Sequence, residues 1–263
     1  MTDWDRHDLY ETCVQSVDHL APLLRAIHGG HPRVLGEDFS GTAALSHAWI
    51  GSDPEAQAIA VDLDDEALRK HTAQERVDAR LADVRDVSDP CDVLFVGNFS
   101  IGYLHTRAEL VEYLSHARSR LNRSPSGGGV FVCDTYGGET AWTIGDVHRP
   151  HSLGGGWVCR YTWEQSEADP LTGMVVNRIH FRIERAGVIE QEILDAFVYR
   201  WRLWSVPELR DAMAEAGFEI TQVYAKLAEA VDDEGNAYTT PVTDPEELDG
   251  SFIVLVAARA GSG

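Results

Sequence analysis

The sequence predicts a doubly wound α/β fold, a mostly parallel seven-stranded sheet with a small antiparallel β-sheet inserted into it. Strand and helix patterns alternate five times before residue 136, which is typical of parallel βαβ units. Between residues 142 and 204 the apolar residues alternate with a period of two instead. One more helix and two apolar strands follow. We therefore expect three segments, with bounds 1–141, 142–204 and 205–263.

The first segment begins with apolar residues near helical spacing, which predict a single helix over residues 7–28. Asp64 is the expected N-cap of a short helix that reaches His71, and Thr106 with Glu109 forms a capping box for the next helix. Apolar runs predict the strands between these helices. The first starts at Val34, and the others cover residues 58–64, 79–84, 92–98 and 129–136.

The second segment predicts three antiparallel strands, joined by turns that contain glycine. The expected strands cover residues 156–166, 175–184 and 188–201. In the third segment, Ser205 and Glu208 form another capping box, and the helix that they begin ends at Gly217. The last two strands, 218–224 and 251–259, then complete the main sheet as an antiparallel pair.

Composition narrows the possible partners and compartment of the chain. Its 263 residues include 43 acidic and 22 basic ones, and a net charge of −21 disfavours nucleic acid as a partner. No apolar run reaches the roughly 18 residues of a membrane span, and the polar start does not resemble a signal peptide. We expect a cytoplasmic monomer or homodimer that does not bind membranes. We expect buried free thiols rather than disulfides or a zinc site from Cys13, Cys91, Cys133 and Cys159.

Acidic residues follow the first two strands of the predicted sheet. Glu37 and Asp38 precede the small-residue turn 40–43, and Asp62 ends the second strand. Ligands of open α/β sheets bind at the carboxyl ends of the strands, where a carboxylate suits ribose hydroxyls or an ammonium group. A dinucleotide site needs G-x-G-x-x-G, whereas this turn has only Gly41 and two negative charges that would repel a diphosphate. S-adenosylmethionine has no phosphate, and it carries a positively charged ammonium group and a sulfonium group. Acidic residues at this turn would therefore attract it.

At this point the chain resembles the class I S-adenosylmethionine-dependent methyltransferases, which have a Rossmann-like sheet. Glu37 matches the acidic residue of their first motif, and Gly41 with Thr42 matches its G-T pair, while Phe39 and Ala43 replace its usual glycines. The resemblance extends from about Val34 to Ala258, and the inserted segment before the last helix is similar to members that methylate small molecules.

The resemblance implies S-adenosylmethionine as the cofactor. It implies a ribose contact for Asp62, an adenine contact for Asp83 with Val84, and contacts to the methionine part for residues 98–100. The full set of expected cofactor residues is Glu37, Asp38, Phe39, Ser40, Gly41, Thr42, Asp62, Leu63, Asp83, Val84, Asn98, Phe99 and Ser100.

The expected reaction is O- or N-methylation of a small-molecule substrate. Methyl transfer is an in-line displacement that positioning alone can accelerate, and an acceptor hydroxyl or ammonium also needs a base. The candidate bases are His105, Glu139 and Tyr136, and the candidate substrate contacts are Tyr103, Arg107, Tyr199 and Trp201. No metal-binding motif is present in the sequence. Two alternatives remain: a noncatalytic nucleoside-binding protein on the same fold, and an NAD(P)-dependent oxidoreductase.

Overall fold

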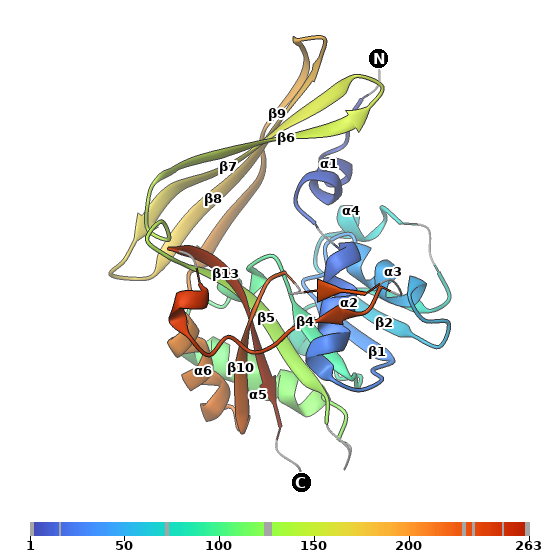
Figure 1. Ribbon diagram of the computed structural model, residues 1–263, viewed down its shortest axis with the longest axis vertical. Coiled ribbons are helices and arrows are strands. Elements are labelled where there is room, and N and C mark those ends of the chain that lie inside the picture. The colour runs from blue at the N-terminus through green and yellow to red at the C-terminus, as the bar shows by residue number, and fades with distance from the viewer. Residues whose placement is uncertain are drawn as a thin grey trace. The chain divides into compact units, whose positions relative to one another are not determined.

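The computed structural model consists of two compact units, each described here by itself (Figure 1). The antiparallel unit joins Met1–Ser16 to Glu139–Leu203, and the α/β unit comprises Val17–Gly138 and Trp204–Gly263. The residues that the structure describes are 3–15, 17–71, 74–123, 128–227, 230–232, 235–248 and 250–260.

The α/β unit is built on a seven-stranded sheet with the order β10-β13-β5-β4-β1-β2-β3. Neighbouring strands are parallel except at β13, which runs antiparallel to both β5 and β10. This topology confirms the predicted fold class, including the antiparallel pair at the end of the chain. The strands are β1 (Val34–Asp38), β2 (Gln57–Asp62), β3 (Val77–Leu81), β4 (Val93–Val96), β5 (Val130–Gly138), β10 (Ile220–Ala225) and β13 (Ser251–Arg259).

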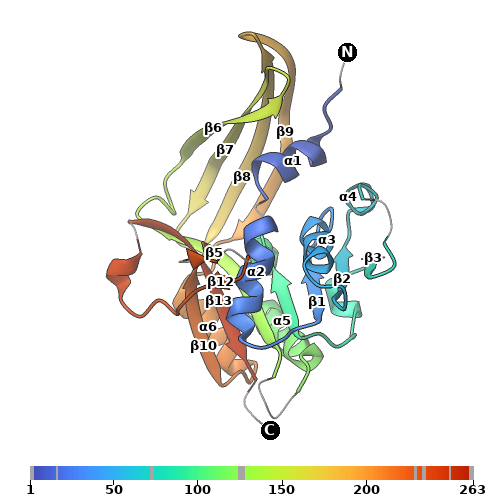
Figure 2. The same cartoon turned by 45° about the vertical axis from the view of Figure 1, so that its right-hand side comes forward.

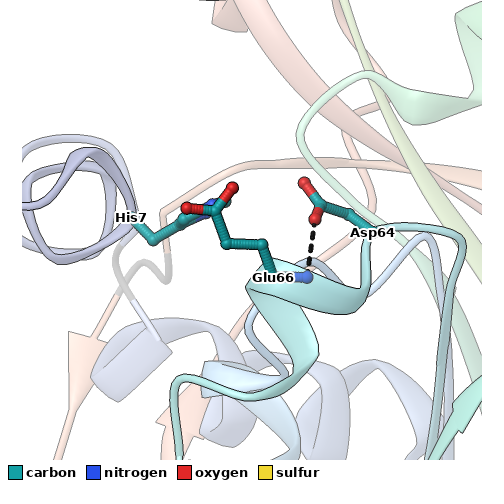
Figure 3. A group of neighbouring side chains, drawn as sticks. All are labelled: His7, Asp64 and Glu66. Carbon is teal, nitrogen blue, oxygen red and sulfur yellow. Dashed lines mark hydrogen bonds between the residues drawn. The ribbon is translucent and has the colours of Figure 1, made fainter.

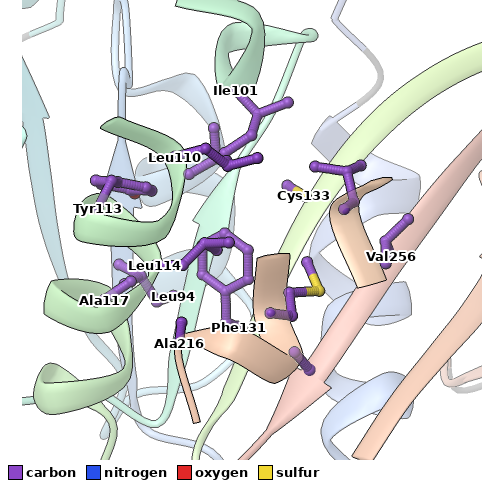
Figure 4. Close-up of a cluster of buried hydrophobic side chains, with 14 of the residues drawn as sticks. Leu94, Ile101, Leu110, Tyr113, Leu114, Ala117, Phe131, Cys133, Ala216 and Val256 are labelled. Atoms are coloured by element: carbon purple, nitrogen blue, oxygen red, sulfur yellow. The ribbon is translucent and has the colours of Figure 1, made fainter. Parts of the chain in front are cut away.

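Helices cover both faces of this sheet (Figures 1 and 2). On one face α2 (Val17–His28) and α3 (Ala44–Gly51) bury an apolar cluster that includes Leu24 and Trp49. On the other face α5 (Arg107–Arg120) and α6 (Val206–Glu215) enclose the cluster shown in Figure 4. The buried strands read as nearly continuous apolar runs because both faces of the sheet are covered.

Local capping interactions set where the helices begin. Both predicted capping boxes are present, Thr106 with Glu109 before α5 and Ser205 with Glu208 before α6. Asp64 caps α4 (Asp65–Leu68) by accepting the Glu66 N–H at 3.0 Å (Figure 3). This helix is shorter than predicted, because the Lys70 N–H bonds to the Ala67 carbonyl in a tighter last turn.

The antiparallel unit contains a four-stranded sheet with the order β6-β7-β8-β9. Three of its strands were expected, whereas β6 was not. Almost every residue of β6 is exposed and Pro150 interrupts it, so the strand lacks the alternating apolar signal and is suited only to an edge. The strands are β6 (Gly145–Gly154), β7 (Trp157–Asp169), β8 (Met174–Arg185) and β9 (Val188–Arg202).

The prediction of one helix over residues 7–28 is wrong, because the structure has two helices there. The first, α1 (Arg6–Cys13), belongs to the antiparallel unit, where Leu9 and Cys13 share an apolar cluster with Cys159. The second is α2 of the α/β unit, whose apolar residues pack on a different core. Apolar spacing that looks continuous along the chain thus serves two separate cores. All four cysteines are buried and free.

Short elements complete the described parts of the chain. None of the helices there is long and apolar enough to cross a membrane. The remaining elements are η1 (Val84–Asp86), η2 (Ser100–Tyr103), β11 (Ala230–Val231), β12 (Ala237–Tyr238) and η3 (Pro245–Glu247).

Candidate cofactor and active site

The strand order places a topological switch point between β1 and β4. The helix that follows β1, α3, packs on one face of the sheet, whereas α5, which follows β4, packs on the other. Open α/β sheets bind their ligands at the carboxyl ends of the strands at such a point. The two loops there are residues 39–43 after β1 and residues 97–99 after β4.

Glu37 is 5% exposed, and its side chain reaches the first turn of α3. Its carboxylate accepts the Ser46 N–H at 2.9 Å and the Ser46 hydroxyl at 2.6 Å. The pKa of Glu37 rises from 4.5 to about 7, mainly because the side chain is buried and in smaller part because Asp62 and Asp38 are negatively charged, while the two hydrogen bonds from Ser46 act in the opposite direction. A positively charged group beside Glu37 would therefore be favourable.

Asp62 ends β2, the strand adjacent to β1, so the two carboxylates lie at the same edge of the sheet as predicted. The Asp62 carboxylate accepts the N–H groups of Gly41 at 2.6 Å and Asp64 at 2.8 Å. The side chain is partly exposed. Asp62 thus ties the turn after β1 to the end of β2.

The turn after β1 keeps a left-handed backbone without the expected glycines. Phe39, Gly41 and Ala43 have φ values of 57°, 55° and 59°. A Cβ atom at Gly41 would meet no other atom within 4 Å, so the space above this residue is open. Among the described residues, the buried hydroxyls of Ser40 and Thr42 have no hydrogen-bond partner. Open space and unpaired hydroxyls fit a polar ligand at this turn.

The loop after β4 is also left-handed, with φ of 54° at Asn98 and 63° at Phe99. Their N–H groups donate to the Asp134 carboxylate at 3.1 and 2.7 Å, and Lys226 Nζ lies 2.9 Å from it. Sequence reasoning missed Asp134 and Lys226. A signal was present, because an acidic residue inside the apolar fifth strand needs a partner when it is buried.

Aromatic side chains connect the loops and strands of this edge. Phe39 stacks on Tyr103, with ring centroids 5.9 Å apart, and Phe99 meets Tyr136 edge-on at 5.0 Å. Ser100 is buried at the start of η2, and His105 is exposed just after that helix. The structure therefore brings Phe39 beside Tyr103 and Phe99 beside Tyr136.

Asp38 points to the opposite face of the sheet from Glu37. It is 0% exposed and accepts two hydrogen bonds from Arg120, both at 2.9 Å, and one from the Tyr113 hydroxyl at 2.7 Å. Successive side chains of a strand point to opposite faces, so Glu37 and Asp38 cannot both face α3. The structure accounts for Asp38 as one half of a buried ion pair.

Three further predicted residues have partners of their own. Val84 is buried in the apolar core. Arg107 forms an exposed ion pair with Glu215. Asp83 pairs with Arg85, whose hydrogen bond lowers the pKa of Asp83 to about 2. Leu63, in contrast, is 71% exposed beside Asp62.

The remaining candidates belong to the antiparallel unit. Glu139 is exposed at its boundary. Tyr199 stacks on Trp201 with ring centroids 4.3 Å apart and planes 14° from parallel, and Trp163 lies 6.0 Å from Trp201. Within this unit the rings form an aromatic stack. A role for Glu139, Tyr199 or Trp201 toward a substrate stays a prediction.

No protein-family model matches the sequence, and no curated protein matches it. Solved structures do match along nearly the whole chain. CalS10, an amino pentose methyltransferase from Micromonospora echinaspora described with bound S-adenosylmethionine, is 16% identical with a TM-score of 0.66, and the match covers 99% of each chain.

Two other solved structures are similar. The sugar N-methyltransferase KedS8 from Streptoalloteichus sp. is 19% identical with a TM-score of 0.62, covering 99% of this chain and 94% of its own. An S-adenosylmethionine-dependent methyltransferase from Clostridium acetobutylicum is 14% identical with a TM-score of 0.64, covering 97% of each chain. The chain therefore has the fold of these S-adenosylmethionine-dependent methyltransferases.

Proposed function

We propose that this protein is an S-adenosylmethionine-dependent methyltransferase that acts on a small-molecule acceptor. The observation that carries the proposal is the pair of carboxylates, Glu37 and Asp62, that flanks the open turn at Gly41 on a methyltransferase fold. Negative charge around this turn suits a cofactor that is cationic and has no phosphate. The same charges oppose the diphosphate of NAD(P), so they argue against an oxidoreductase.

Each residue of the edge would meet one part of the cofactor. Asp62 would accept hydrogen bonds from the ribose hydroxyls, and the exposed Leu63 would contact the adenine. Asp83 would meet the adenine amino group from the end of β3. The hydroxyls of Ser40 and Thr42, which are buried without partners among the described residues, would donate or accept beside Gly41.

The methionine part would lie between the two loops of the switch point. Glu37 would balance the charge of the ammonium group, through the turn or a water molecule, because burial makes its negative charge unfavourable without a positive partner. Asn98, Phe99 and Ser100 would line the other side. When bound, S-adenosylmethionine supplies an electrophilic methyl group.

The acceptor side of the site would be formed by Tyr103 and Tyr136, which pack on Phe39 and Phe99. An acceptor amine is protonated near neutral pH and attacks only after it loses that proton. His105, exposed after η2, is the proposed base because an imidazole nitrogen can take up the proton that the acceptor loses. Holding the nucleophile in line with the methyl group would supply most of the remaining acceleration.

We propose an amine-bearing sugar as the first acceptor class to test. CalS10 is described as acting on an amino pentose and KedS8 as a sugar N-methyltransferase, and both share this fold. The net charge of −21 also favours a cationic acceptor over an anionic one. A panel of amino sugars with isotopically labelled methyl donor would identify the methylated product.

Calorimetry tests the cofactor directly. We expect S-adenosylmethionine and S-adenosylhomocysteine to bind and NADH not to bind. Tight binding without turnover on any acceptor would instead favour a noncatalytic nucleoside-binding protein.

The Asp62→Ala variant tests the ribose contact. Hydrogen bonds to a charged group contribute about 1.5–3 kcal/mol, so S-adenosylhomocysteine should bind about 10- to 100-fold more weakly. Asp65→Ala is the matched control, because Asp65 lies three residues further along and forms an exposed ion pair with Arg69. Unchanged affinity in Asp62→Ala, with wild-type circular dichroism, would refute the assignment.

A further inference from the structure

We propose that Asp134, supported by Lys226, is a positioning residue for methyl transfer. Its carboxylate holds the loop after β4 in the conformation that presents Asn98 and Phe99 to cofactor and acceptor. Neither Asp134 nor Lys226 contacts the reacting atoms in this proposal. The inference rests on the proposed function, because it concerns the same site.

The Asp134 carboxylate bonds two consecutive backbone groups that are in a strained conformation. Oδ1 accepts the Phe99 N–H at 2.7 Å, and Oδ2 accepts the Asn98 N–H at 3.1 Å. Both residues are left-handed, which non-glycine residues adopt at a cost. Successive N–H groups in such a turn converge on one anion. Here that anion is the side chain of β5, so the loop conformation depends on it.

Lys226 connects this carboxylate to the ring of Phe99. Its ammonium group lies 2.9 Å from Asp134 Oδ2 and 5.2 Å from the centroid of the Phe99 ring. Asp134 is 1% exposed, so its charge requires a counter-charge. The Phe99 ring in turn meets Tyr136 at 5.0 Å. One cation therefore holds both the backbone anchor of the loop and the side chain at its tip.

The chain offers a matched acid at the opposite edge of the same sheet. Asp92 Oδ2 accepts the consecutive N–H groups of Arg33 and Val34 at 2.8 and 2.9 Å, and its Oδ1 accepts Asn122 Nδ2 at 2.8 Å. This carboxylate makes the same kind of backbone bonds as Asp134. It precedes β4, whereas Asp134 faces the loop that follows β4. A substitution of Asp92 therefore shows how the loss of such backbone bonds affects stability when the loop after β4 is left unchanged.

The test compares Asp134→Asn with Asp92→Asn in the full chain. Both substitutions keep the shape of the side chain and remove its charge, and both should lower the urea midpoint. We expect Asp134→Asn to weaken S-adenosylhomocysteine binding at least tenfold by calorimetry, and Asp92→Asn to change it less than twofold. The Asn98 and Phe99 amide resonances should shift in the ¹H–¹⁵N spectrum of Asp134→Asn and stay in place in Asp92→Asn.

Lys226→Met provides a milder variant in case Asp134→Asn does not fold, because the Lys226 side chain is 31% exposed. It should shift the Phe99 amide resonance and weaken binding by a smaller factor. Equal loss of affinity in the two Asn variants, or shifted amide resonances with unchanged affinity, would overturn the positioning role alone. Failure of the wild-type protein to bind S-adenosylhomocysteine would overturn the proposed function and this inference together.

Discussion

The two edges of the seven-stranded sheet use left-handed residues differently. At the amino edge, where the helices lead into strands, the left-handed positions after α2 and α6 are Gly29 and Gly217, with φ of 76° and 91°. At the carboxyl edge the same backbone region is occupied not only by Gly41 but also by the non-glycine residues Phe39, Ala43, Asn98 and Phe99. In the described parts of the chain six non-glycine residues have positive φ, and these are four of them.

This difference separates the part of the sheet that supplies stability from the part where the proposed site lies. Glycine adopts a left-handed conformation without steric cost, so the amino edge is relaxed. For a non-glycine residue the left-handed conformation costs roughly 1–2 kcal/mol of stability, and such strain persists only where the surrounding structure holds it. At the carboxyl edge the carboxylates of Asp62 and Asp134 bond the strained loops. Stabilising interactions in the rest of the unit therefore offset the strain of these loops.

The largest expected effect concerns Asp38, which ends β1 at the carboxyl edge but faces the interior. Asp38→Ala leaves the buried Arg120 guanidinium without a counter-charge, which typically destabilises a protein by about 3–5 kcal/mol. Urea unfolding monitored by circular dichroism would measure the loss.

Adding Arg120→Met to Asp38→Ala removes the buried charge as well, so the double variant should be more stable than Asp38→Ala alone. Cofactor affinity should change little in any variant that folds. If Asp38→Ala lowered the free energy of unfolding by less than 1 kcal/mol, the ion pair would not supply the stability that we assign to it.

Glu37 should make the stability of the chain depend on pH. Its pKa rises from 4.5 to about 7 on folding because the side chain is buried. Between these values the folded chain keeps a proton that the unfolded chain has lost, so stability falls as pH rises to about 7 and stays low above it. Relative to Glu37→Gln, wild type should lose up to about 3 kcal/mol across this range.

Urea unfolding of both proteins at several pH values isolates this effect, because groups that do not interact with Glu37 contribute equally to the two curves. A difference that stays constant with pH would mean that Glu37 is not held in a desolvated position at the carboxyl edge.

The smallest expected effects test the strain itself. Gly29→Ala at the amino edge should destabilise by about 1 kcal/mol, because a Cβ there has no neighbour nearer than 4.0 Å and only the φ value opposes it. Ala43→Gly at the carboxyl edge should be neutral or slightly stabilising, because relief of strain offsets the greater freedom of the unfolded chain. Thermal unfolding would compare them, and equal losses in both variants would contradict the contrast between the edges.

The sequence by itself determined most of the elements and the edge of the sheet at which the proposed site lies. Both capping boxes and the apolar strands were predicted because each depends on residues within one turn or one strand. The turn around Gly41 was identified because acids next to small residues at a strand end are a local pattern. The backbone of this turn is left-handed even though Phe39 and Ala43 stand where glycines are usual.

Only the tertiary structure decided which charged groups meet. Asp38 forms an ion pair with Arg120, which is 82 residues away in the sequence, and Asp134 forms one with Lys226, which is 92 residues away. It also decided that residues 6–28 form two helices on separate cores, and that β6 adds an edge strand. Periodicity shows that a side chain is buried or exposed, whereas its partner depends on how distant segments pack. The partners that hold the loops of the proposed site could therefore not be predicted from the sequence, although the sequence predicted at which edge of the sheet that site would lie.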